Sequence, residues 1–190
     1  MIQDSGKLFV VSGPSGTGKT TLCRQLEAEL GLFFSISATT RPIRVGEIEG
    51  RDYYFLSDEK FREMETAGEF LESAAVHGHC YGTPAKPIES HLGLGEDVIL
   101  DIDTQGALNI KENFPEAILI FLKPPSEADL YRRLKNRGTD SEETIQRRMK
   151  RAEGEIQQSS HYDFIVTNRD IETAKEELRK IILQFRGSKQ

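Results

Sequence analysis

Residues 7–20 read KLFVVSGPSGTGKT, an apolar run followed by a glycine-rich loop that ends in a lysine and a threonine. The segment 13–20 matches the phosphate-loop pattern G-x-x-x-x-G-K-[ST] in full, a match that chance produces in under about one chain of this length in a hundred. The run 7–11 predicts a buried strand, and the good helix formers of 22–30 predict a helix after the loop. An ordinary glycine-rich turn is the alternative, but the match and its context favour a nucleotide-phosphate site.

The residue types of this loop suit the binding of a nucleoside triphosphate. Glycines at 13, 16 and 18 let backbone N–H groups turn toward phosphate oxygens, and the following helix directs its positive end to the same point. Lys19 can reach the β- and γ-phosphates, and the Thr20 hydroxyl can bind Mg²⁺. The loop residues predicted to contact this triphosphate are Gly13, Pro14, Ser15, Gly16, Thr17, Gly18, Lys19, Thr20 and Thr21.

The composition fits a single α/β domain. The chain has 190 residues, 29% of them charged, and a net charge of −6, so no nonspecific attraction to nucleic acid or an acidic membrane is expected. Cys23 and Cys80 are too few and too far apart for a disulfide framework or a metal site, which fits a reducing compartment. Since no apolar run approaches the roughly 20 residues that span a bilayer, and no signal peptide is evident, we expect a cytoplasmic monomer or small homo-oligomer.

Three more apolar runs predict strands that are buried on both faces of a parallel sheet. They lie at 97–103, 117–122 and 163–167. Helical patterns alternate with these runs, as βαβ crossovers require, and Ser126 and Ser141 are candidate N-caps. The helical patterns lie at 104–113, 126–136, 141–159 and 171–185. The predicted fold class is therefore α/β, a phosphate-loop NTPase-type parallel sheet flanked by helices.

Two segments interrupt this alternation. The first, about 35–93, is rich in Gly, Tyr, Arg and Thr, and we predict an inserted α+β subdomain there. Its candidate elements are an alternating strand at 52–56 and two short helices near 57–67 and 84–92. The second segment, about 136–151, is dense in arginine around Gly138, and we predict a helical lid over the site. The core of the single domain 1–190 then comprises about 1–34, 94–135 and 152–190.

Polar residues that suit phosphate or metal chemistry gather in two places. Arg41 and Arg44 offer forked donor sets to phosphate oxygens and Tyr53 adds a hydroxyl, although such arginines are usually solvated surface charge. Asp101 and Asp103 end an apolar strand, where an α/β sheet places its ligand crevice. Asp103 can equally be the N-cap of the helix that begins at 104, which is compatible with a ligand role.

The order of motifs resembles that of the guanylate kinase family over about residues 7–176. After the phosphate loop come SATTRPIRVGE (37–47), GRDYYF (50–55), EFLE (69–72), YGT (81–83) and DIDTQG (101–106). That family uses ATP and Mg²⁺ to phosphorylate GMP to GDP, with a core sheet, a GMP-binding subdomain and a lid. The resemblance implies the same reaction here, with dGMP as a further acceptor.

The resemblance also implies roles for individual residues. The GMP phosphate is assigned to Arg41, Arg44, Tyr53 and Tyr81. The guanine base is assigned to Ser37, Glu72, Thr83 and Asp103. Catalysis is assigned to Lys19 and to the lid arginines Arg133, Arg137 and Arg148. Asp101 is expected to order Mg²⁺ through water beside Thr20, and Asn168 to approach the adenine. The neighbouring cations Arg132, Arg147, Lys150 and Arg151 are interpreted as solvated helix faces.

Chemistry supports the guanine assignment independently. Guanine presents adjacent N1–H and N2–H₂ donors, and an ionised Glu72 can accept from both. Hydroxyl donors at Ser37 and Thr83 suit the guanine O6 acceptor, where the adenine amino group would meet them donor to donor.

The sequence departs from the family pattern at two positions, and two alternative functions remain. Arg169 stands where the family usually has an acidic residue after Asn168, which weakens the assignment for the donor base, and Cys80 stands where an aromatic is common. A non-catalytic interaction domain of the same fold is one alternative, although such domains tend to lose the loop residues that Gly18 and Lys19 supply here. A phosphate-loop kinase with another acceptor is the other.

Overall fold

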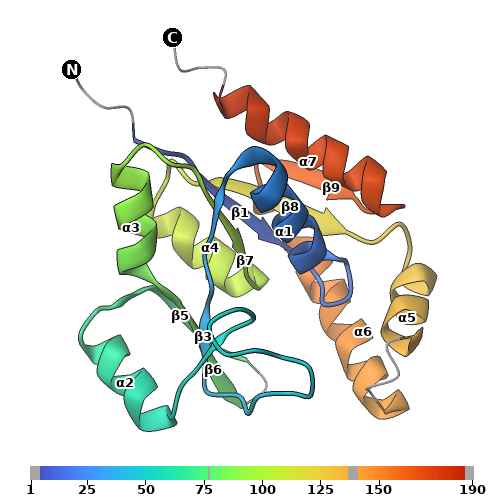
Figure 1. The fold of residues 1–190 in the computed structure, drawn as a ribbon. Helices are drawn as coiled ribbons and strands as arrows, with labels where there is room; N and C mark the ends of the chain where they lie inside the picture. The colour runs from blue at the N-terminus through green and yellow to red at the C-terminus, as the bar shows by residue number, and fades with distance from the viewer. Residues whose placement is uncertain (1–4, 77, 137–140, 187–190) are drawn as a thin grey trace.

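A parallel sheet forms the core of the molecule. The computed structural model describes residues 5–76, 78–136 and 141–186. Within them, five parallel strands run in the order β2-β7-β1-β8-β9 (Figure 1). The strands are β1 (Leu8–Ser12), β2 (Phe33–Phe34), β7 (Val98–Asp101), β8 (Ile118–Lys123) and β9 (Phe164–Thr167). The expected parallel sheet is confirmed, with β1 at its centre.

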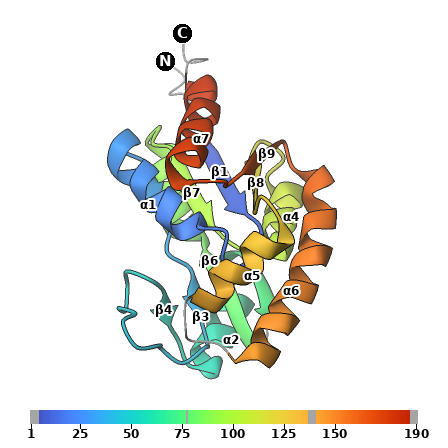
Figure 2. The same cartoon turned by 90° about the vertical axis from the view of Figure 1, so that its right-hand side faces the viewer.

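Helices cover both faces of this sheet (Figure 2). They are α1 (Lys19–Leu30) and α7 (Ile171–Arg186) on one face, and α3 (Ala85–Gly93) and α4 (Thr104–Asn113) on the other. Phe9 and Val11 of β1 pack under α1 and α7, whereas Leu8 and Val10 pack under α3 and α4. Because all five residues of β1 are buried, its sequence is a continuous apolar run rather than an alternating one.

Side-chain caps fix where three of the helices begin. Asp103, Ser126 and Ser141 each accept a hydrogen bond from the backbone N–H three residues on, at 2.8, 3.1 and 3.3 Å. They precede α4, α5 (Glu127–Asn136) and α6 (Glu142–Gln157). The two predicted serine caps and the alternative cap role of Asp103 are thus confirmed, and α6 ends in a 3₁₀ turn, Gln158–His161, rather than continuing as helix to 159.

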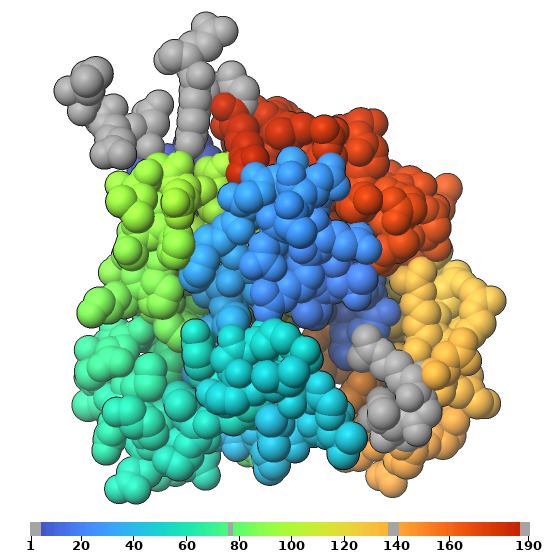
Figure 3. All heavy atoms as spheres, in the orientation of Figure 1, coloured from blue at the N-terminus to red at the C-terminus, as the bar shows by residue number. Residues whose placement is uncertain are grey.

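A second sheet, in the order β4-β3-β6-β5, lies beside the core and forms the cyan and green lower part of the molecule in Figure 3. Its strands are β3 (Ala38–Thr39), β4 (Tyr54–Phe55), β5 (Phe70–Val76) and β6 (His79–Pro84). Helix α2 (Asp58–Thr66) closes this sheet through Phe61, which is buried and stacks on Phe70 with ring centroids 4.6 Å apart. This sheet supplies the α+β insertion that interrupts the core.

The insertion differs from the sequence expectation in its details. The strand predicted at 52–56 is only Tyr54–Phe55, because these are the residues that pair with β3. The antiparallel β5–β6 hairpin was not predicted, since 70–84 lacks regular apolar alternation. Helix α3 packs its buried Ile88 against Leu8 and Val98 of the core sheet, so the last part of 35–93 rests on the core.

Helices α5 and α6 form a separate pair in the predicted lid region. Their contact is a small apolar cluster, Leu130, Leu134, Ile145 and Ala152. In the part of the chain described here, no helix combines the length and the apolar character that crossing a membrane demands.

Candidate active site

The phosphate loop wraps around its own lysine. Gly13, Gly16 and Gly18 have φ of 136°, 91° and 90°, a backbone region that side chains resist. At Gly13 a Cβ would also lie 2.2 Å from the carbonyl oxygen of Leu122, so both the positive φ and the close backbone contact require glycine there. The Lys19 Nζ donates to the carbonyl oxygens of Gly13 at 2.8 Å and Pro14 at 3.2 Å. The loop and the start of α1 thus place one cation and several N–H groups at the edge of the sheet.

The Asn168 side chain hydrogen-bonds to the phosphate loop. Its Nδ2 donates to the Thr17 carbonyl oxygen at 2.7 Å, and its side chain approaches Gly18, where a Cβ would lie 3.0 Å from that nitrogen. The Asn168 Oδ1 is buried and has no hydrogen-bond partner within the described residues. The structure therefore gives Asn168 a role in positioning the loop, while its expected contact with adenine stays a prediction.

Thr20 and Asp101 meet at the mouth of the loop. The Thr20 hydroxyl donates to the Asp101 Oδ2, joining the start of α1 to the end of β7. Burial raises the pKa of Asp101, and the nearby Lys19 ammonium and the Thr20 hydrogen bond oppose that rise. These two oxygen-bearing side chains are therefore adjacent, and the Mg²⁺ role expected of them stays a prediction.

A cavity of about 250 Å³ adjoins the loop and draws its walls from three parts of the chain. The loop and α1 contribute Gly13, Ser15, Lys19 and Thr20. The insertion contributes Ser37, Arg44, Tyr53, Glu72, Ala74 and Tyr81. The end of β7 and helix α6 contribute Asp101, Ile102, Asp103, Arg148, Arg151 and Glu155. Six of the eight predicted GMP residues and four of the ten predicted ATP residues thus line a single space, and Arg41 and Thr83 are the GMP residues that do not.

The predicted phosphate-binding residues of the insertion form one cluster. Arg41 is nearly buried and makes two hydrogen bonds to the Glu47 carboxylate, at 3.0 and 2.8 Å. Glu47 also accepts from the backbone N–H of Arg44 at 2.8 Å. The rings of Tyr53 and Tyr81 stand edge to face beside these arginines, with centroids 5.9 Å apart. The sequence assigned no role to Glu47, and the structure shows that it binds the Arg41 side chain and the backbone of Arg44.

Glu72 is the buried acid of the cavity. Its side chain is 9% exposed, and its Oε1 accepts a hydrogen bond from the Thr83 hydroxyl at 2.7 Å. Burial raises the pKa of Glu72 to about 7, the Thr83 hydrogen bond opposes this, and the charge of Asp103 adds to the rise. Thr83 is fully buried and commits its only proton to Glu72. Thr83 thus supports Glu72 from behind, and its direct contact with guanine stays a prediction.

Two polar residues of α6 were missed by the sequence interpretation. Arg151, expected on a solvated helix face, is half-buried, donates to Glu155 at 2.7 Å and lies 3.9 Å from the Asp103 carboxylate. Burial raises the pKa of Glu155, and Arg151 opposes that rise. Both share a helix face with Arg148, because 148, 151 and 155 follow the helical spacing of three and four. This helical spacing was the sequence signal that could have placed Arg151 and Glu155 beside Arg148.

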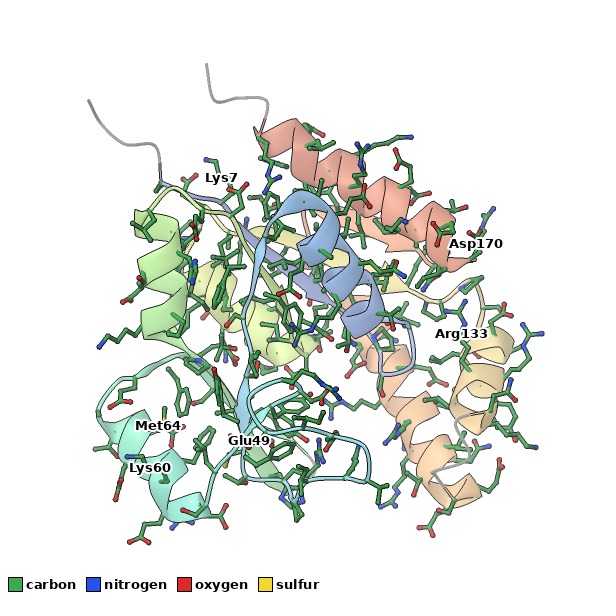
Figure 4. The ribbon with its side chains drawn as sticks, viewed as in Figure 1. Lys7, Glu49, Lys60, Met64, Arg133 and Asp170 are labelled. Atoms are coloured by element: carbon green, nitrogen blue, oxygen red, sulfur yellow. The ribbon has the colours of Figure 1, made fainter. Side chains whose placement is uncertain are left out.

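Of the two remaining lid arginines, only Arg133 lies within the described residues. Arg133 does not line the cavity, because its guanidinium donates to the carbonyl oxygens of Asn168 and Arg169 at 2.8 and 3.4 Å (Figure 4). Arg137 lies outside the described residues. The catalytic roles expected of both stay predictions.

Known proteins resemble this chain along nearly its full length. A protein-family model described as guanylate kinase matches residues 5–185. The guanylate kinase of Caldanaerobacter subterraneus subsp. tengcongensis is 49% identical over 183 residues, which cover 96% of this chain and 89% of the relative. That of Fusobacterium nucleatum subsp. nucleatum is 48% identical over 177 residues, covering 93% and 96%. A crystal structure of guanylate kinase from Anaplasma phagocytophilum superposes with a TM-score of 0.80 at 36% identity, covering 97% of this chain and 88% of that one.

Proposed function

This chain belongs to the guanylate kinase family, and on that premise we propose how its cavity brings ATP and GMP together. The chain is a kinase that phosphorylates GMP with ATP, and the non-catalytic alternative is not favoured, since guanylate kinases match nearly all of it. The observation that carries the residue roles is that one cavity joins the phosphate loop to the buried Glu72. A donor site and a base-reading site therefore share one space.

The guanine of GMP is proposed to bind between the insertion and the start of α4. An ionised Glu72 accepts from N1–H and N2–H₂, Asp103 accepts a second hydrogen from N2, and Ser37 donates to O6. The Thr83 hydroxyl keeps the Glu72 carboxylate in place. Adenine offers a lone pair at N1, so its binding would leave a buried carboxylate facing an acceptor.

The GMP phosphate is proposed to bind at the cluster of Arg41, Arg44, Tyr53 and Tyr81. Glu47 binds the Arg41 guanidinium with both oxygens and the Arg44 backbone N–H with one of them, so the Arg41 side chain and the backbone at Arg44 are ordered before the phosphate arrives. Preordered donors lose less conformational entropy on binding, which favours a fixed position of the acceptor phosphate.

The triphosphate of ATP is proposed to bind the N–H groups of the loop and Lys19. The loop also fits a magnesium ion, because Thr20 and Asp101 present adjacent hard oxygen donors. Among the described residues no cluster of three acidic, histidine or cysteine side chains could hold a metal, which suits an ion held mainly by substrate phosphates. When bound, Mg²⁺ would neutralise charge on the transferred phosphoryl group.

The proposed catalytic contribution of the protein is to position the two nucleotides and to supply positive charge, rather than to transfer a proton. The phosphate of GMP is already anionic near neutral pH, so its attack on the γ-phosphorus requires no general base. Lys19 and Arg148 line the same cavity and supply positive charge where two polyanions must approach. Arg133 and Arg137 would act when the lid closes and excludes water.

A nucleotide panel tests this proposal. ADP formation from ATP is measured in a coupled assay with GMP, dGMP, AMP, CMP and UMP as acceptors. We expect GMP and dGMP to be used, and AMP to be slower by about a hundredfold or more, because it leaves Glu72 unpaired. Comparable rates with AMP contradict the guanine-reading role. A cytoplasmic location, the lack of nucleic-acid binding and the oligomeric state stay predictions, the last measurable by ultracentrifugation.

A further inference from the structure

Helix α4 lies against the Glu72 side chain at Gly106, a residue without a side chain. Gly106 stands in the first turn of this helix and is buried. A Cβ at Gly106 would lie 2.7 Å from the Glu72 Oε2 and 2.9 Å from its carboxyl carbon, closer than side chains tolerate. The absence of a side chain at Gly106 therefore creates the space in which the Glu72 carboxylate lies.

The same glycine also contacts the second guanine-facing acid. The Gly106 backbone N–H donates to the Asp103 Oδ1 at 2.8 Å, which leaves the other Asp103 oxygen toward the cavity. One residue thus orders both carboxylates, by its N–H group on one side and by its missing Cβ on the other.

Backbone conformation does not explain a glycine at this position. Gly106 is not among the described glycines with positive φ, and it lies in the first turn of a regular helix, where alanine is the better helix former. Gly93 and Gly154, the two other glycines in the described helices, would meet nothing within 4 Å of an added Cβ. The close neighbour at Gly106 is the carboxylate of Glu72.

We propose that Gly106 is a positioning residue for guanine specificity, which sets the place of the Glu72 carboxylate through direct backbone contact. The inference rests on the proposed role of Glu72 in reading guanine. A side chain at 106 would displace the carboxylate from its Thr83 hydrogen bond or push α4 away from β5. In either case the acceptor oxygens move from the positions that N1–H and N2–H₂ require, whereas the phosphate loop is untouched.

The test compares Gly106→Ala with Gly154→Ala, the matched helical control. Both substitutions favour helix formation, and only the first meets a neighbour. We expect Gly106→Ala to raise the KM for GMP about tenfold or more with the KM for ATP within about twofold, and Gly154→Ala to leave both KM values near wild type. Unchanged GMP parameters in folded Gly106→Ala, or equal losses for GMP and ATP, overturn the proposal.

Comparing Glu72→Asp with the double variant Glu72→Asp/Gly106→Ala covers the case in which Gly106→Ala alone fails to fold. The shorter acid withdraws the carboxylate from the glycine, so Gly106→Ala should cost little in GMP affinity or in urea unfolding in the Glu72→Asp background. A double variant that also fails to fold, or that binds GMP about tenfold or more weakly than Glu72→Asp, overturns the proposal. Glu72→Gln alone separates the two levels of inference: if it leaves GMP binding unchanged, the proposed role of Glu72 fails, and if it weakens GMP while Gly106→Ala does not, only the present proposal fails.

Discussion

Replacing Glu72 with glutamine is expected to stabilise the nucleotide-free protein at pH 8. Burial, reinforced by Asp103, raises the pKa of Glu72 from 4.5 to about 7. An acid whose pKa is higher in the folded state binds its proton more tightly there. Its contribution to stability is therefore complete below about pH 4.5 and is lost as the pH rises through about 7. Glutamine has almost the same shape, remains neutral and keeps a carbonyl oxygen for the Thr83 hydroxyl, so it avoids this loss.

The size of the effect follows from the same shift. A rise of about 2.5 pKa units corresponds to about 3 kcal/mol of unfolding free energy, an upper limit because the cavity admits water. The unfolding free energy of Glu72→Gln should therefore exceed that of the wild type by up to about 3 kcal/mol at pH 8, and by little at pH 5. For a chain of this size each kcal/mol moves the thermal midpoint by about 2–4 °C.

Urea unfolding of both proteins at pH 5, 6, 7 and 8, without nucleotide, measures this difference. Glu89→Gln serves as the control, because Glu89 is an exposed glutamate on α3. The gap between Glu72→Gln and wild type should widen from pH 5 to about pH 7 and level off toward pH 8, whereas the control should follow the wild type. A gap that is the same at pH 5 and pH 8 would refute the reasoning, because an uncharged effect of the substitution has no reason to follow pH.

Three further expectations concern the substrates. Lys19→Ala should lower turnover by several orders of magnitude with similar thermal unfolding, because it removes the cation of the loop, and near-normal turnover contradicts that role. The dissociation constant for GMP should rise up to about tenfold for each pH unit below about 7, as Glu72 gains a proton. In Glu72→Gln only the shallower pH dependence of the GMP phosphate should remain. If calorimetry gives the same pH dependence of the dissociation constant for both proteins, Glu72 is not the group that titrates. Glu47→Gln should weaken GMP about tenfold by releasing Arg41 and leave ATP within about twofold, whereas equal losses for the two nucleotides would place Glu47 outside the acceptor site.

The core of the fold was predictable because its signals are local. The strand, loop and helix of 7–30 follow from an apolar run, a glycine pattern and a helix-forming segment. The pattern at 104–113 gives the observed bounds of α4, because Asp103 supplies a cap at one end and the apolar spacing continues to the other. Each of these signals lies within about a dozen residues of the structure that it predicts.

The β5–β6 hairpin was not predictable in the same way. Residues 70–84 combine glycine, histidine, cysteine and one glutamate, and their alternation is set by which face lines the cavity rather than by a simple apolar core. Arg151 was misjudged for a related reason. Its charge is typical of a solvated face, and only the packing of α6 beside Asp103 shows that it faces inward.

The role of Glu72 in the candidate site follows only from the sequence and the structure together. Its motif predicted the residue but not its burial, which arises because Thr83 from β6 and Gly106 from α4 enclose the carboxylate. An enclosed carboxylate has lost much of its water, so its charge is costly until new donors arrive. Guanine supplies two N–H donors at adjacent positions, whereas adenine supplies a lone pair. The burial that lowers stability at neutral pH therefore also sets the discrimination between bases, because the stronger the desolvation of Glu72, the larger the penalty for a base that cannot donate to it.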